Sequence, residues 1–230
     1  MALTNKIKIL FIVNITFFIF LSSLLFSQSN IDSLKGLLPK VKGHERIKLL
    51  VDIGFSLQSE NPKEAIKYLD EAIDLAKETN QSWSLADAYF NKGVALWHLG
   101  DITESDHQYE LAIPIYEELN DSLSLIKVFN SQAINQNLKG NIEETFKIFF
   151  QSLDYARKVG DRTTIVNSLV NIGITYDNNG DFNNSLKYYF EALKLTEEND
   201  KATTALLQSY IAEIYLTLKD NAKAEEYLKK

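Results

Sequence analysis

The stretch that decides the fold is Asn171–Leu195, NIGITYDNNGDFNNSLKYYFEALKL. Its central glycine, Gly180, is preceded at equal intervals by Gly140 and Gly100, and each of these glycines is followed by Asp or Asn. Small residues recur with nearly the same spacing, at Gly54, Gly93, Ala133, Gly173 and Ala212. Self-similarity at a fixed period of roughly 20–50 residues is the signature of a repeat array. The whole chain is therefore predicted to be built from one repeating unit.

Each unit has the pattern of two helices joined by a turn. Apolar residues share one helical face before the turn and another after it, at Leu169, Ile172 and Tyr176 and then at Leu186, Tyr189 and Leu193. Between them, Gly180 is suited to the left-handed conformation that ends a helix, and Asp181 is suited to cap the next one. The unit is predicted to be an antiparallel helix pair, in which small residues such as Gly173 allow the two helices to approach closely.

The order of these residues resembles the tetratricopeptide repeat. A small residue is followed three positions later by Leu or Tyr and seven positions later by Gly-Asp, and the second helix carries an aromatic and then a small residue. The usual period of that repeat is about 34 residues, whereas this array has a longer period of about 40 residues. It is similar in this to a longer-helix subclass found in bacterial signalling proteins and kinesin-light-chain-like binders. The resemblance covers about 42–230 and implies an all-α, right-handed superhelical solenoid of antiparallel helix pairs.

Three segments are expected along the chain. Residues 1–27 have two lysines and then an apolar stretch over 9–26, which is typical of a signal peptide or of an N-terminal membrane anchor. Both alternatives stay open, and both predict export, with the array in the periplasm or anchored facing it. Residues 28–43 are expected to form a connector or cap helix. Residues 44–230 are expected to hold four repeats and a truncated fifth, whose unfinished edge suggests either a fragment of a longer protein or coverage by a partner, including self-association.

Composition and residue types argue against several functions. The net charge is −7, or −9 without residues 1–27, and no clustered basic face is present for nucleic acid. There is no cysteine, there are only three histidines, and no glycine-rich phosphate loop or metal-ligand spacing occurs. We therefore expect no catalytic residue, no metal site and no cofactor in this chain.

The candidate site is the concave surface that stacked helix pairs create, lined by the first helix of each pair. In the register of the repeat its candidate residues are Phe90, Asn91, Trp97, Asn130, Asn137, Asn167, Asn171 and Asp177. The asparagines resemble the ladder by which long-period tetratricopeptide arrays hold a peptide backbone, since an amide both donates and accepts. Ordinary polarity of a helix surface is the alternative interpretation.

These observations predict an exported scaffold that binds a protein or peptide in its groove and is not itself an enzyme. The alternative is the extracytoplasmic sensor segment of a longer two-component histidine kinase or transcriptional regulator. In that case catalysis would belong to another part of the full-length protein.

Overall fold

The computed structural model describes residues 31–197 and 199–229, and every regular element in this part of the chain is helical. The predicted signal or anchor, with its apolar residues 9–26, lies outside the described residues. Across the part that is described, no helix combines the length and the apolar character that crossing a membrane requires.

The helices follow one another with short connections. Residues 31–37 are helical. They lead to η1 (Leu38–Lys40), α2 (Gly43–Leu57), α3 (Pro62–Glu78), α4 (Ser82–His98), α5 (Ile102–Glu118), α6 (Ser122–Leu138), α7 (Ile142–Val159), α8 (Arg162–Asn178), α9 (Phe182–Leu195), α10 (Lys201–Thr217) and α11 (Asn221–Leu228). The prediction of an all-α array of helix pairs is confirmed.

The chain divides after Gly100 into two compact units. In the first unit, α2 packs on α3 and both contact α4. Ile31 at its start is almost fully buried, and Lys35 Nζ lies 2.8 Å from Glu64 Oε1 on α3. The Arg46 guanidinium of α2 donates to the Leu38 carbonyl at 2.8 Å. Residues 31–40 are thus attached to the first helix pair by apolar burial and by charged hydrogen bonds.

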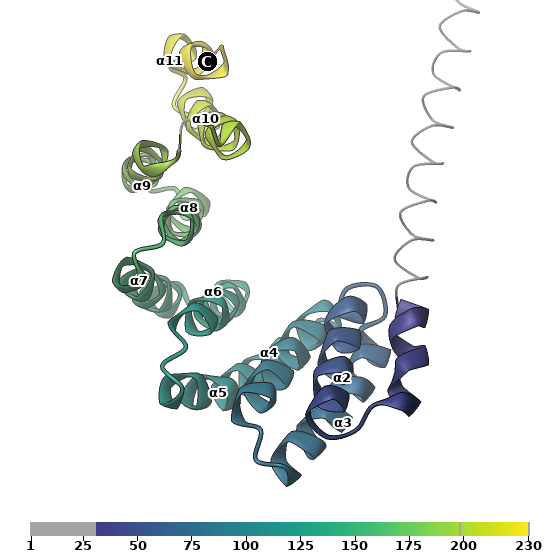
Figure 1. Cartoon of the computed structure of the whole chain (residues 1–230). Coiled ribbons are helices and arrows are strands. Elements are labelled where there is room, and N and C mark those ends of the chain that lie inside the picture. The colour runs from purple at the N-terminus through teal and green to yellow at the C-terminus, as the bar shows by residue number, and fades with distance from the viewer. Residues whose placement is uncertain (1–30, 198, 230) are drawn as a thin grey trace, which may run out of the picture. The chain divides into compact units, whose positions relative to one another are not determined.

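The second unit contains α5 to α11, and each of these helices contacts the next in sequence. Figure 1 shows α6, α8 and α10 along one side of this unit and α7, α9 and α11 along the other. This alternation gives the unit two kinds of surface. One is made by the first helices of the pairs and the other by the second helices.

Small residues bring the paired helices together. A Cβ added at Gly173 would lie 2.4 Å from Tyr189 Cε1, and one at Gly54 would lie 2.5 Å from Leu69 Cγ. Both distances are well inside van der Waals contact, so no larger side chain fits without movement. The predicted role of the small positions in close packing is confirmed at these two glycines.

The turns explain the regular period. Gly100, Gly140 and Gly180 end the first helices with φ of 80°, 78° and 75°, in the left-handed region that costs glycine least. Asp101 and Asp181 then accept hydrogen bonds from backbone N–H groups three residues later, at 3.2 and 3.1 Å. The turns at Gly100 and Gly180 thereby end one helix and cap the next, whereas Asn141 after Gly140 makes no side-chain cap bond.

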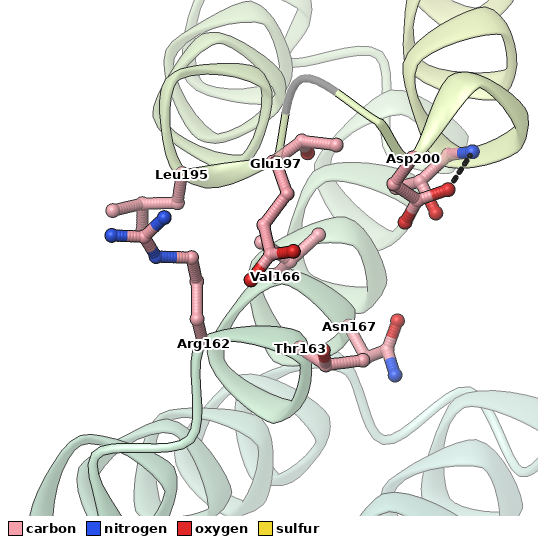
Figure 2. Close-up of a pocket in the computed structure, with 9 residues that line it drawn as sticks. Arg162, Thr163, Val166, Asn167, Leu195, Glu197 and Asp200 are labelled. Carbon is pink, nitrogen blue, oxygen red and sulfur yellow. Dashed lines mark hydrogen bonds between the residues drawn. The ribbon is translucent and has the colours of Figure 1, made fainter.

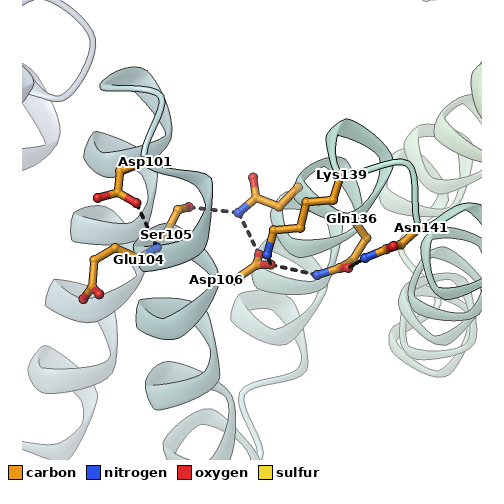
Figure 3. A network of polar contacts seen from close by, with 8 residues as sticks. Asp101, Glu104, Ser105, Asp106, Gln136, Lys139 and Asn141 are labelled. Carbon is orange, nitrogen blue, oxygen red and sulfur yellow. Dashed lines mark hydrogen bonds and ion pairs between the residues drawn. The ribbon is translucent and has the colours of Figure 1, made fainter.

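The junctions between successive pairs differ in chemistry. At the α5–α6 junction, Asp106 accepts from Asn135 and Gln136 at 2.7 Å each and from Lys139 at 2.5 Å (Figure 3). Phe146 and Tyr176 take the places of Asp106 and Gln136 one repeat later, and their rings meet at a centroid separation of 4.3 Å at the α7–α8 junction. The same two register positions are therefore polar in one junction and aromatic in the next.

Candidate functional site

The exposed surface of α6, α8 and α10 is the candidate site in the second unit. On α6, Asn137 and Leu138 follow Ile134 by three and four residues, and on α10 Glu213 follows Leu206 by seven and Leu216 follows Glu213 by three, which places them on one side of each helix. On α8 the face includes Asn167 and Asp177. We call this surface the first-helix face and define it by Ile134, Asn137, Leu138, Asn167, Asp177, Leu206, Glu213 and Leu216.

Large apolar side chains on this face are open to solvent. Ile134, Leu138, Leu206 and Leu216 are 41%, 59%, 46% and 50% exposed. Apolar groups of this size that recur along one surface, with polar residues between them, are typical of a site that meets another molecule. The exposed side chains of this surface are suited to apolar contact with a partner.

The charged residues of the first-helix face are acidic on α8 and α10. Asp177 is half-buried, and Glu213 is exposed. Burial raises the pKa of the Asp177 carboxyl, and the nearby Glu213 carboxylate raises it further. The two carboxylates therefore lie close enough to repel each other.

The first unit has a separate cavity of about 270 Å³ between α2 and α4. It is lined by His44, Lys48, Val51, Asp52, Trp83, Ser84 and Asp87. Only Val51 and Ser84 of these are buried, and His44 Nδ1 lies 3.1 Å from Gln81 Oε1 at its edge. Its mixture of an indole, acids and a lysine is suited to contacts with a polar chain.

A smaller cavity of about 60 Å³ lies in the second unit where α8 begins and α9 leads into α10. Figure 2 shows Arg162, Thr163, Val166 and Asn167 of α8 on one side and Leu195, Glu197 and Asp200 on the other. Asp200 is occupied as the cap of α10, since it accepts from Thr203 N at 3.0 Å. The cavity is small, and the cap bond of Asp200 already uses one of the polar groups that line it.

The predicted asparagines divide into two groups. Asn91 is buried and donates to the Asp87 carbonyl of its own helix at 2.8 Å, and Asn130 accepts from Ser152 of α7 at 2.8 Å. Asn167 is exposed, and Asn137 and Asn171 are partly exposed. In the described part of the chain, no side-chain hydrogen bond holds any of these three amides to the rest of the protein. A ladder through Asn91 and Asn130 would have to break these internal bonds.

The remaining predicted residues lie at or near the surface. Phe90 is partly exposed, and the ring of Trp97 is exposed and meets His98 edge-on at a centroid distance of 4.9 Å. These two belong to the first unit, whereas Asp177 belongs to the first-helix face of the second. The predicted residues are thus distributed over the two compact units.

Sequence reasoning missed Leu138 on α6, Leu206, Glu213 and Leu216 on α10, and Tyr189 beneath them. The period itself contained the signal for α10, because Glu213 follows Ile174 by one repeat and Ile134 by two. For Tyr189 the signal is its hydroxyl, since Phe149 fills the same register position one repeat earlier.

A metal centre has no support from the side chains that the structure describes. Among residues 31–197 and 199–229, no three His, Cys, Asp or Glu side chains are grouped as ligands for one ion. The exposed side chains of the first-helix face form a contact surface.

Comparisons with known proteins identify the repeat. The family model described as tetratricopeptide repeat matches residues 86–121, 166–199 and 211–230, and the model for anaphase-promoting complex subunit 5 matches residues 46–92. No curated protein matches the sequence significantly.

Solved structures share the fold at low identity. BtubC from P. vanneervenii is 16% identical with a TM-score of 0.71, covering 89% of this chain and 86% of its own. A signal transduction ATPase with numerous domains from Pyrococcus horikoshii, which has a tetratricopeptide repeat sensor, is 23% identical with a TM-score of 0.73, over 84% of this chain and 30% of its own. NprR in complex with its cognate peptide NprX is 22% identical with a TM-score of 0.63, over 87% and 58%.

Proposed function

We propose that this chain, whose helix pairs are tetratricopeptide repeats, is a non-catalytic scaffold that binds a protein or peptide along the first-helix face. The observation that carries the proposal is the row of exposed apolar side chains on α6 and α10, Ile134, Leu138, Leu206 and Leu216. A buried packing role does not account for side chains with this exposure, and their burial by a partner would be favourable at about 25 cal/mol per Å².

The similar proteins support the same class of function. The NprR structure holds a peptide, and the Pyrococcus horikoshii protein carries its repeats as a sensor. Both likenesses concern fold, so the binding surface is argued from the side chains of this chain.

Selection from a displayed library of random peptides tests this proposal. Peptides that bind the wild-type chain are expected to lose affinity for Ile134→Asp and for Leu216→Asp, because each variant places a charge in the apolar contact. Val159→Asp is the matched control, since Val159 is 38% exposed at the end of α7, a second helix. Equal loss of binding in Val159→Asp, or no loss in the two face variants, would refute the assignment.

We further propose that the array works outside the cytoplasmic membrane, as the input segment of a longer regulatory protein. The export part rests on the lysines and apolar stretch of residues 1–27. The regulatory part is supported by the likeness in fold, because the Pyrococcus horikoshii protein carries its repeats as a sensor and NprR was solved with its cognate peptide. A histidine kinase or a transcriptional regulator would fit this arrangement, and the catalysis would then lie outside this segment.

The intact mass of the native protein tests this second proposal. A mass well above the 26.2 kDa of this chain, in a membrane or periplasmic fraction, is the expected result. A mass at or below 26.2 kDa would contradict the input-segment proposal, and recovery from the cytoplasm alone would contradict export. If cross-linking instead found a partner only at the end of α10 and on α11, that result would favour self-association or a capping partner at this end of the array.

A further inference from the structure

The first-helix face contains a position between α8 and α10 where three polar groups gather without a counter-charge. The groups are the carboxylates of Asp177 and Glu213 and the hydroxyl of Tyr189, and we call them the acidic position. Their placement follows from the way in which Tyr189 packs.

Tyr189 reaches from α9 to the space between α8 and α10. Its ring lies against Gly173 of α8, with Cζ only 3.1 Å from where a Cβ would be, and it stacks on Tyr210 of α10 at 5.3 Å. Asp177 lies one helical turn beyond Gly173, and Glu213 lies one turn beyond Tyr210. The hydroxyl of Tyr189 is therefore held beneath the two carboxylates.

The hydroxyl of Tyr189 is buried and has no hydrogen-bond partner in the described structure. Burial raises the pKa of the Tyr189 phenol, and the adjacent Ser185 hydroxyl lowers it. Ser185 nevertheless gives its own proton to the Gly173 carbonyl at 2.9 Å, so it does not donate to Tyr189. A buried polar group left unpaired costs free energy, so such a group in a native fold calls for an explanation. A ligand that brings hydrogen-bonding groups to this position supplies one.

The carboxylates also lack a cation. Within the described residues, neither Asp177 nor Glu213 forms an ion pair, although the same chain pairs Asp106 with Lys139 and Glu191 with Arg157. Two close carboxylates at the edge of a buried hydroxyl favour a ligand that is positively charged and carries several N–H donors. A guanidinium has five such donors in a planar fork and is the side chain that best satisfies more than one carboxylate.

We propose that the acidic position receives the guanidinium of an arginine in the bound protein or peptide, with Asp177 and Glu213 accepting its N–H groups and Tyr189 completing the contact. This inference rests on the proposed peptide-binding function. The apolar neighbours Leu206 and Leu216 lie on the same face of α10 as Glu213, so the partner segment carries apolar residues beside its arginine.

Titration with Nα-acetyl-arginine methylamide, followed by NMR of the tyrosine ring resonances, tests the proposal on the full chain. The matching citrulline derivative has the same shape without the charge. The arginine probe is expected to bind, and the citrulline probe to bind at least about tenfold more weakly, which corresponds to the loss of charge-assisted hydrogen bonds. Equal affinity for the two probes would overturn the proposal.

Variants locate the binding. Asp177→Asn with Glu213→Gln is expected to weaken the arginine probe by about tenfold or more, and Tyr189→Phe, which keeps the ring, by a few-fold. Glu117→Gln with Glu118→Gln is the matched control, because it removes two charges from exposed residues at the end of α5. An equal loss of affinity in this control would mean that the overall negative charge of the chain attracts the probe, and it would refute the site.

The outcome is separable from the broader function. Library peptides that still bind, lose affinity for Ile134→Asp, and are indifferent to Asp177→Asn with Glu213→Gln would support the scaffold and refute the arginine site. Circular dichroism of each variant checks that the helices are retained. The Asp177→Asn change removes a repulsion, so the double variant is expected to fold.

Discussion

Substitution of Gly173 by alanine tests the packing that places Tyr189. In the structure the new Cβ would lie 2.4 Å from Tyr189 Cε1 and 2.6 Å from Cδ1, where ordinary contacts are 3.4–4 Å. The ring would have to move by about 1 Å, and the stack of Tyr189 on Tyr210 at 5.3 Å restricts movement on its other side. The helices would be forced apart or the ring would leave its rotamer.

The expected magnitude follows from two opposing effects. Overpacking of a filled core costs about 1–3 kcal/mol, and the higher helix propensity of alanine returns about 1 kcal/mol. Because the new Cβ would come within 2.4 Å of the ring, the upper part of the overpacking range applies, about 2–3 kcal/mol. We therefore expect the free energy of unfolding of Gly173→Ala to fall by about 1–2 kcal/mol, which lowers the melting temperature by about 2–8 °C for a chain of this size.

Urea and thermal unfolding followed by circular dichroism measure this change. Gly36→Ala is the matched control, because Gly36 is also helical and a Cβ there would meet nothing within 4 Å. That control is expected to be neutral or stabilised by up to about 1 kcal/mol. A Gly173→Ala protein as stable as the wild type would refute the close-packing argument, and the placement of Tyr189 would lose its support.

Three further predictions concern the junctions and turns. Asp106→Ala takes the acceptor from three donors at the α5–α6 junction and should lower the free energy of unfolding by about 3 kcal/mol. Lys139→Ala should lower it by only about 1 kcal/mol, because Lys139 is 32% exposed and Asp106 keeps its amide donors. Equal losses in urea unfolding would contradict this account. Lys219→Gly should raise the melting temperature, since Lys219 has a φ of 63° that costs about 1–2 kcal/mol in a residue with a Cβ, and a lowered melting temperature would refute the strain. The side chain and then the backbone N–H of Asn184 lower the pKa of Asp181, so its stabilisation is present above the unfolded-state pKa and is lost as pH falls through the folded-state pKa. Asp181→Asn keeps the capping oxygen without titrating, and its unfolding midpoint should therefore decline less steeply in acid than that of the wild type; parallel declines would exclude this contribution.

Much of the architecture follows from local residues. The glycines at 100, 140 and 180 and the aspartates at 101 and 181 place each turn, because only a few residue types satisfy a left-handed backbone or an exposed helix start. Since these constraints act within a few residues, the repeat, the helix pairs and the likeness to tetratricopeptide repeats were all correctly predicted.

The binding surface depended more on packing between pairs. Asn91 and Asn171 occupy the same position of the repeat, two residues before Gly93 and Gly173, yet Asn91 is buried in a bond to its own helix and Asn171 is partly exposed. The register of the repeat does not predict which of these asparagines is buried. An error of one residue in the register already rotates a side chain by about a quarter of a turn around the helix axis.

The sequence by itself determined the period, the helices and the acidic balance, because turn chemistry and apolar spacing act locally. Only the tertiary structure decided which groups meet across pairs. It placed Tyr189 between Gly173 and Tyr210 and brought Asp177 beside Glu213. The physical reason is that these residues belong to three different helices, and their proximity depends on how closely the backbones pack, which no single segment encodes.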